Sequence, residues 1–171
     1  VDVAALRASN GGTPHAINYF LASPDGSKVA AGISQGGSEA ASLFVYDTAT
    51  GKQIARPLDR ADPCFTTWIN DSSTLYFARL EKLAPGEADI EKYRNPTLVS
   101  WNLKSEPVAV LGSTAGRGPS FLPDELPTLS ISPGAPMAMA VSINGVQNEL
   151  ALWLAPVSQV NDPNVKWTPF V

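Results

Sequence analysis

Apolar and polar residues alternate along most of the chain, in short runs that end at Gly, Pro, Asp or Ser. Runs of about four to seven such residues, bounded by turn-forming residues, are typical of strands joined by tight turns. The turns of the first round begin at Ser23 and at Thr48. The pattern therefore predicts four strands in this round, at residues 17–21, 28–33, 42–47 and 52–54.

The same pattern returns twice. The second round predicts strands at residues 65–69, 74–79, 97–103 and 107–111, and the third at residues 128–131, 137–143, 149–154 and 167–171. The first turns of the three rounds begin at Ser23, Asn70 and Ser132. A repeat of about 50 residues with four strands is typical of propeller blades, which stack because one blade cannot bury both of its faces. We therefore predict an all-β, partial β-propeller of about three four-stranded antiparallel blades, at residues 14–60, 63–114 and 126–171.

Helical signals are few. Residues 87–93 could form one or two helical turns inside the long connection from Leu80 to Asn95. We interpret this connection as a solvated insertion; the alternative is a loop at the propeller rim that contacts a partner.

Composition fits one packed domain. The 171 residues are 44% hydrophobic and 16% charged, with a formal net charge of -4. A slightly acidic chain is a poor match for nucleic acid or for an anionic membrane surface, because both bind basic patches. No apolar run reaches the roughly 20 residues of a transmembrane helix. The composition therefore predicts neither nucleic-acid nor membrane binding.

Both ends of the chain lead us to expect a processed protein or a piece of a longer one. The chain begins at Val1 without an initiator Met or the pattern of a signal peptide, and residues 166–171 form an apolar, strand-like ending. The compartment stays open between cytoplasm and periplasm.

Residues 32–36 match G-x-S-x-G, a pattern that presents a nucleophilic serine only where a strand turns sharply into a helix. No helix is predicted after Ser34, and the single histidine, His15, precedes it. We therefore predict a glycine-rich hairpin here, an exposed or capping His15, and a buried apolar role for the single cysteine, Cys64. A Cys–His pair would lack a third, orienting group. We assign no catalytic residue.

Metal and cofactor sites are not predicted either. One His and one Cys cannot form the usual zinc cages, and no D-x-D-x-D loop is present. Nothing in the sequence places two acidic residues as the facing carboxylate pair that glycoside chemistry needs. They are scattered over loops: Asp59, Asp62, Glu81, Glu87, Asp89, Glu91, Asp124 and Glu125. The glycosylation sequon at residues 70–72 is better interpreted as a tight turn.

The four tryptophans fall at apolar strand positions. This placement predicts packing between blades for Trp68, Trp101, Trp153 and Trp167, and the alternative is a platform on which a ligand stacks.

Residues 20–39, with a Ser-Pro-Asp-Gly turn, an alternating strand and a Ser-Gln-Gly-Gly-Ser-Glu stretch, resemble the opening propeller segment of the prolyl oligopeptidases, serine peptidase family S9. Residues 45–52, 67–71 and 75–79 resemble segments that follow in that family, in the same order. Three sites depart from the pattern. Ala40 replaces an aromatic residue, and Ser72-Ser73 and Gly134-Ala135 replace Asp-Gly.

The resemblance implies a propeller fragment that acts as scaffold and substrate gate for a missing α/β-hydrolase domain, which would hydrolyse short, proline-containing peptides. The family's catalytic Ser, Asp and His lie in that domain, so no enzymatic activity is expected of this chain alone. Its substrate-binding residues stay unknown. Expected partners are the hydrolase domain, short peptides bound by the parent protein, and a second copy of the open fragment. No cofactor is implied.

The alternative from another class is a non-enzymatic propeller of the TolB-like or PD40 type that binds other proteins. A G-x-S-x-G motif followed by Asp and then His, encoded beyond Val171, would favour the peptidase. A sugar- or lactone-processing propeller is a weaker option, because it needs a central metal site.

Overall fold

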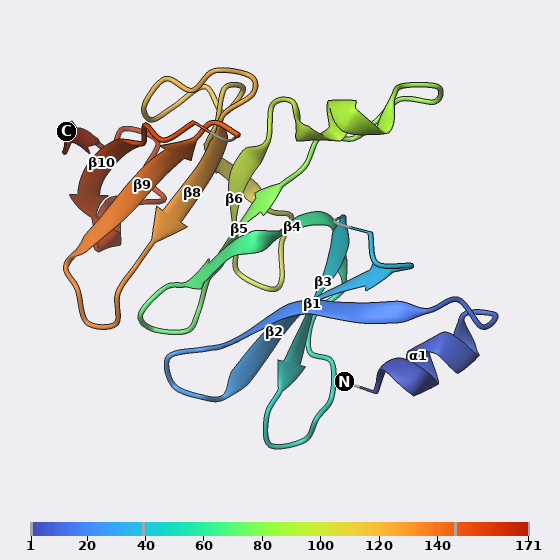
Figure 1. Cartoon of the computed structure of the whole chain (residues 1–171). Helices are drawn as coiled ribbons and strands as arrows, with labels where there is room; N and C mark the ends of the chain where they lie inside the picture. Colours follow the sequence, from blue (N-terminus) through green and yellow to red (C-terminus); the bar gives the residue numbers. More distant parts are fainter. Residues whose placement is uncertain (1, 39, 146, 171) are drawn as a thin grey trace.

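A computed structural model describes residues 2–38, 40–145 and 147–170, without the side chains of residues 63–65. The chain forms two antiparallel sheets in its described part, and they follow one another along the chain from the N-terminal to the C-terminal end (Figure 1). A short helix, α1 (Val3–Ser9), precedes the first sheet. The predicted all-β architecture, a partial propeller, is confirmed.

The first sheet has seven strands in sequence order, so each strand pairs with its neighbours along the chain. Its members are β1 (His15–Ala22), β2 (Lys28–Gln35), β3 (Ala41–Asp47), β4 (Leu58–Trp68), β5 (Leu75–Arg79), β6 (Thr97–Trp101) and β7 (Val108–Leu111).

Strand β4 belongs to two meanders. Its beginning pairs with β3, where Leu58 lies opposite Leu43, and its end pairs with β5, where Trp68 lies opposite Leu75. The register shifts between Ala61 and Thr66, which marks the change of partner. We call β1–β3 with the first part of β4 the first blade, and the rest of β4 with β5–β7 the second blade.

The second sheet is the third blade, with strands in the order β11-β10-β9-β8. Its strands are β8 (Leu126–Ser130), β9 (Met137–Ile143), β10 (Ala151–Pro156) and β11 (Thr168–Pro169). The short 3-10 helix η2 (Val157–Gln159) follows β10.

Two sequence-based strand predictions need correction. Residues 52–54 form no strand; Gln53 makes one isolated bridge to Tyr46, and the pairing partner of β3 begins at Leu58. Ile54 is 43% exposed, so its apolar side chain does not mark a buried strand here. The last strand covers Thr168–Pro169 rather than residues 167–171, and proline has no N–H to extend a ladder.

Helical structure was underestimated. The predicted turns at residues 87–93 are the 3-10 helix η1 (Asp89–Tyr93), in an arm that projects from the second blade (Figure 1). Helix α1 was not predicted. Its signal is Asp2, whose carboxylate accepts hydrogen bonds from the backbone N–H groups of Ala4 and Ala5 at 2.9 and 3.1 Å, as an N-cap does.

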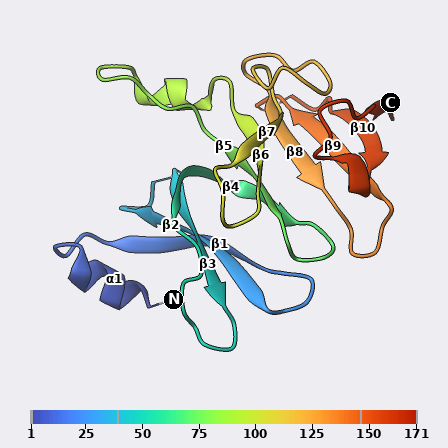
Figure 2. The ribbon, with the colours of Figure 1, turned by 180° about the vertical axis from the view of Figure 1, so that it is seen from behind.

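The core consists of two apolar layers between blades. Strand β1 contacts β4, and β8 contacts β4, β5 and β6, so the first strand of each blade lies against the neighbouring blade. In Figure 2, β1, β4 and β8 follow one another across the molecule. One layer joins the first and second blades through Val45, Trp68, Phe77 and Trp101 among others. The other joins the second and third blades through Leu98, Leu111, Leu129, Ala140 and Val160 among others.

The four tryptophans lie in these layers, as predicted. Trp68 and Trp101 are 3% and 1% exposed in the first layer, and Trp153 and Trp167 pack against the second. The Trp68 indole also donates a hydrogen bond to the Leu21 carbonyl of the preceding blade, at 3.3 Å. The tryptophans therefore join blades and do not form an open platform.

The first turns of the three blades are hydrogen-bonded to one another. The Asp25 N–H of the first blade donates to the Ser72 hydroxyl of the second at 3.2 Å. The Asn70 amide of the second donates to the Ala135 carbonyl of the third at 3.3 Å. The sequon at residues 70–72 is thus part of a tight turn that links blades, and we call the three turns the turn seam.

Candidate functional site

The serine of the G-x-S-x-G motif is a structural residue. Ser34 lies inside β2, is 1% exposed, and donates a hydrogen bond from its hydroxyl to Asn18 Oδ1 at 2.7 Å. A strand, and not a helix, surrounds it, so the sharp turn that exposes a nucleophile is missing. The predicted glycine-rich turn does follow, at Gly36 and Gly37, which both have positive φ.

His15 cannot act on Ser34, because the register separates the two side chains. His15 pairs with Gln35 and Ala16 pairs with Ser34, so His15 and Ser34 point to opposite faces of the sheet. The His15 ring instead lies 2.9 Å from the Thr13 carbonyl through Nδ1. The prediction of a buried Cys64 lies outside the described side chains.

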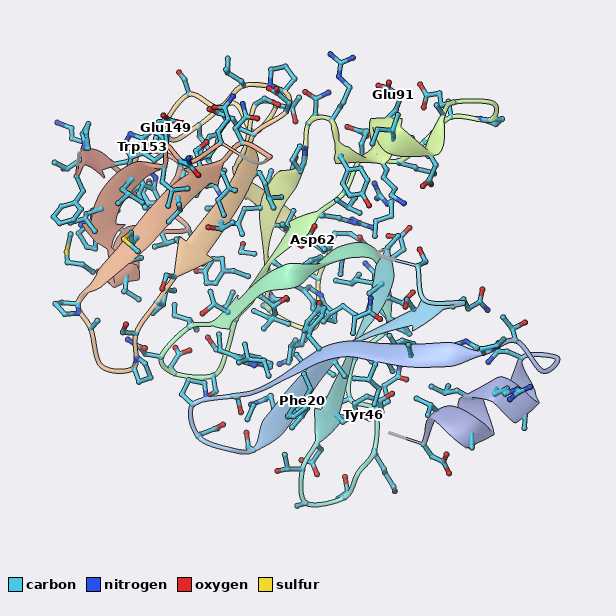
Figure 3. The ribbon with its side chains drawn as sticks, viewed as in Figure 1. Phe20, Tyr46, Asp62, Glu91, Glu149 and Trp153 are labelled. Carbon is cyan, nitrogen blue, oxygen red and sulfur yellow. The ribbon has the colours of Figure 1, made fainter. Side chains whose placement is uncertain are left out.

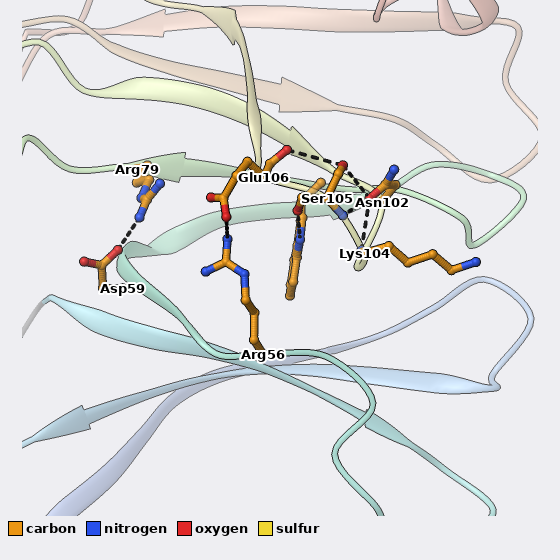
Figure 4. A network of polar contacts seen from close by, with 8 residues as sticks. Arg56, Asp59, Arg79, Asn102, Lys104, Ser105 and Glu106 are labelled. Carbon is orange, nitrogen blue, oxygen red and sulfur yellow. Dashed lines mark hydrogen bonds and ion pairs between the residues drawn. The ribbon is translucent and has the colours of Figure 1, made fainter.

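The acidic residues serve loops and ion pairs. Asp59 pairs with Arg79 and with Arg60. Glu106 pairs with Arg56 at 2.6 Å across the first two blades. Figure 4 shows the Asp59–Arg79 and Glu106–Arg56 pairs. Burial alone would raise the pKa of Asp59, but the guanidinium groups outweigh burial and lower that pKa. Glu87 and Glu125 accept backbone N–H bonds within their own loops, at 2.6 and 2.7 Å. No carboxylate pair emerges from these contacts.

Among the described residues, no group of three or more His, Cys, Asp or Glu side chains is placed to hold a metal ion. No helix in the described ranges has the length and apolar character needed to cross a bilayer.

The first candidate surface is the open face of the first blade. Phe20, Ala31 and Phe44 lie side by side across β1, β2 and β3, on the face directed away from the second blade. Phe20 is 75% exposed, and the rings of Phe44 and Tyr46 stack at 6.3 Å. Phe20 and Tyr46 both lie on this blade in Figure 3. Helix α1 lies near one end of the face, where Leu6 and Phe44 line one pocket.

The second candidate surface is the open face of the third blade. Side chains alternate along β9 and β10: Trp153 points to the second blade, while Met139 and Leu154 lie opposite one another on the other face. Met137 on this face is 41% exposed. Each end of the arc therefore presents an apolar sheet face, whereas the sheet faces between adjacent blades are covered.

Sequence reasoning foresaw that the outer blades of an incomplete ring would be open, but not which residues mark them. Strand alternation could have identified Phe20, which lies between the half-buried Tyr19 and Leu21, and Met137, which precedes the buried Ala138.

Comparisons with known proteins agree with this architecture. Residues 6–103 match the family model described as the prolyl oligopeptidase N-terminal beta-propeller domain. A search of curated protein sequences finds no match.

Solved structures give the same picture. Prolyl oligopeptidase B from Galerina marginata, bound to a 35mer substrate, matches with a TM-score of 0.78 and 15% identity over 97% of this chain and 24% of that one. A structure from a study of two prolyl endopeptidases matches with a TM-score of 0.72 and 19% identity over 100% of this chain and 22% of that one. The hydrazine synthase of Kuenenia stuttgartiensis is more distant, with a TM-score of 0.52 and 16% identity over 82% of this chain and 40% of that one.

The chain therefore spans about a quarter of each of these peptidase chains, and at such identities the structural matches establish the fold alone. The family model covers more than half of the present sequence, from α1 through β6. It includes the turn, strand and glycine-rich stretch on which the family resemblance rests. This chain belongs to the prolyl oligopeptidase N-terminal β-propeller domain family.

Proposed function

We propose that the chain acts as a substrate gate. It forms part of a propeller that limits which peptides reach a separate serine hydrolase domain. That domain would cleave short, proline-containing peptides, and the chain itself would supply scaffold and no catalytic group. The observation that supports the proposal is the three-blade arc whose two end faces are apolar and uncovered. Further blades on those faces would close a ring, and a narrow ring axis admits only small substrates.

The test uses the parent protein that contains this chain and its hydrolase domain. Two rates are compared: cleavage of a proline-containing chromogenic dipeptide, and cleavage of a long unfolded polypeptide with the same site. Trp68→Phe keeps most of the buried ring but removes the hydrogen bond between the Trp68 indole and Leu21 of the neighbouring blade. If the blades restrict access, this variant raises the rate on the long substrate relative to the dipeptide.

Ser34→Ala is the matched control, because Ser34 is buried within one blade and makes no bond across blades. It should leave both rates within about twofold of the parent. Discrimination between long and short substrates that is identical in the parent and in Trp68→Phe would count against gating. Turnover of the dipeptide by the chain alone, abolished by Ser34→Ala, would refute the scaffold assignment.

The reading frame that encodes the parent separates this proposal from a protein-binding propeller. A G-x-S-x-G motif followed by Asp and His in that frame supports the gate. A frame that encodes propeller repeats and no hydrolase motifs would replace the gate with an interaction module.

A further inference from the structure

Helix α1 lies over one end of the open face of the first blade. In Figures 1 and 2 it lies below β1, on the side of this blade that is directed away from the second blade. Leu6 of α1 lines a pocket of about 240 Å³ together with Ile33 of β2 and Phe44 of β3. Both strand residues lie on the same face as Ala31, which is the open face. The helix therefore covers part of the surface that a neighbouring blade would need.

A narrow apolar stripe holds the helix on this face. Val3 and Leu6, which lie one helical turn apart, are half-buried, while the other side chains of α1 are exposed and none is fully buried. The pocket between the helix and the strands is space that side chains leave unfilled. Well-packed contacts leave few spaces larger than a water molecule, so the contact between α1 and the blade is loose.

The helix forms a unit with its own hydrogen bonds. The Asp2 carboxylate accepts the N–H groups of the first turn, and the Arg7 guanidinium donates to the Gly12 carbonyl at 3.0 Å. Gly11 and Gly12, which link the helix to β1, both have positive φ, and nothing lies within 4 Å of a Cβ built on either. The link therefore has room to move, and α1 can leave the face without losing these bonds.

A sheet cannot pack on this face while α1 lies there. Two packed sheets are about 10 Å apart, and a helix with its side chains is about 10–12 Å across. The helix thus fills the layer that a docked sheet would occupy. Farther along the same face, Phe20 is 75% exposed, so a docking sheet would cover additional apolar surface once the helix had left.

The third blade of a second copy fits this face. Within the chain, each blade packs one face against the opposite face of the following blade, through the two apolar layers. The open face of the third blade, with Met137 and Met139, is the face that the first and second blades bury against the blade that follows them. Placing it on the open face of a first blade would repeat the contact that already joins the blades inside one chain.

We propose that α1 is a removable cover on the open face of the first blade, and that the third blade of a second copy must displace it to dock there. In the single chain, the helix shields part of the apolar face. In the associated form, it swings away on residues 11–12. The inference goes beyond the proposed gate and does not depend on it, because the chain alone is sufficient to test it.

Leu6→Ser tests the cover. The substitution removes the apolar anchor of α1, so the face is uncovered for a larger fraction of the time. The dissociation constant of self-association, measured by sedimentation equilibrium, should therefore fall about three- to tenfold. Loss of an apolar side chain from an ordinary contact surface would raise that constant instead. Ala8→Ser is the matched control, because Ala8 is exposed on the same helix, and it should change the constant by less than about twofold.

An unchanged or higher dissociation constant in Leu6→Ser would overturn the cover, and so would an equal fall in Ala8→Ser. Absence of association in both the full chain and Leu6→Ser would overturn it as well. The double variant Leu6→Ser/Phe20→Ser should lose the tighter association, since Phe20 lies on the docking face. If the double variant kept the tighter association, the contact would lie elsewhere and the proposal would fail.

NMR relaxation measures the cover directly. Backbone order parameters of residues 3–9 should fall below those of β2 and β3 as the chain concentration rises and the associated form accumulates. Order parameters of α1 that equal those of the strands in the associated form would show that the helix stays on the blade, which contradicts its displacement.

Discussion

At the residue scale, Gly32 lies against the ring of Tyr19, its neighbour across β1 and β2. A Cβ on Gly32 would overlap that ring. The ring packs against the layer between the first two blades, so it cannot move without uncovering apolar surface. Close packing against Tyr19 thus explains why the first residue of the G-x-S-x-G motif is glycine.

We therefore expect Gly32→Ala to lower the free energy of unfolding by about 2 kcal/mol, as overpacking does. Gly36→Ala is the comparison: its φ is 60° but nothing lies within 4 Å of its Cβ, so only about 1 kcal/mol of backbone strain applies. Urea unfolding measures both. In a Tyr19→Leu background the cost of Gly32→Ala should shrink, and an unchanged cost there would show that the ring is not the cause.

Ser72 has a strained backbone but makes a hydrogen bond between two blades. Its φ is 60°, a value that favours glycine, yet its buried hydroxyl accepts the Asp25 N–H of the turn seam. Ser72→Ala keeps the strain and loses the bond, and should cost about 1–2 kcal/mol of unfolding free energy. Ser72→Gly loses the bond but relieves the strain, so it should be about 1 kcal/mol more stable than Ser72→Ala. Thermal unfolding would contradict this account if the alanine variant were the more stable of the two.

At the scale of elements, three turns of the first two blades share one feature: an aspartate that accepts hydrogen bonds from its own turn. The Ser23 hydroxyl, followed by Ser27, lowers the pKa of Asp25, the Thr50 hydroxyl lowers the pKa of Asp47, and the Ser73 hydroxyl lowers the pKa of Asp71. A carboxyl whose pKa is lowered by folding stabilises the fold when ionised. Its contribution is present above the unfolded pKa of about 3.9 and is lost as pH falls through the folded value.

We expect the urea midpoint to be flat from neutral pH down to about 5 and to fall below about 4. Asp25→Asn should reduce that acid-induced loss, since the asparagine cannot titrate, while lowering stability at neutral pH. Asp124→Asn is the control, because Asp124 is exposed on a loop. A midpoint that drops equally with pH in the Asp25→Asn variant and the parent would exclude Asp25 from the effect.

Short apolar runs bounded by turn-forming residues were sufficient to predict β2, β3, β5 and β9. Only β3 alternates between buried and half-buried positions. Strand β5 has consecutive buried side chains because both of its faces are covered, with Phe77 in the first layer and Tyr76 in the second.

The same pattern failed at β4, whose end at Trp68 was foreseen but whose beginning at Leu58 was not. Pairing partners change within that strand, and a change of partner leaves no period in the sequence. The hydrogen bond between Asp25 and Ser72 in the turn seam was missed for a similar reason: the two residues are far apart in the chain and meet only through packing of blades.

At the scale of the whole molecule, the arc has two apolar ends that differ from each other. The first blade presents Phe20 and Phe44, and the third presents Met139 and Leu154. Contacts between unlike surfaces of identical chains are head-to-tail, and they close into rings when the rotation allows it. We therefore expect the chain to self-associate, with the open face of one copy's first blade on the open face of another's third blade.

Light scattering over a concentration series measures this association, and the expected result is a mass that rises from one chain towards two. Phe20→Ser on the first blade and Met137→Ser on the third should each weaken it by tenfold or more, since each removes about 1.5–3 kcal/mol of apolar burial from the contact. Ile90→Ser is the control, because Ile90 is 66% exposed but lies on the η1 arm away from both faces. A mass of one chain at every concentration would refute the association. If Ile90→Ser weakened the association as much as Phe20→Ser does, the contact would lie on the η1 arm and not on the end faces. A contact that depends on both end faces would mean that two copies cover the surfaces on which additional blades are proposed to lie.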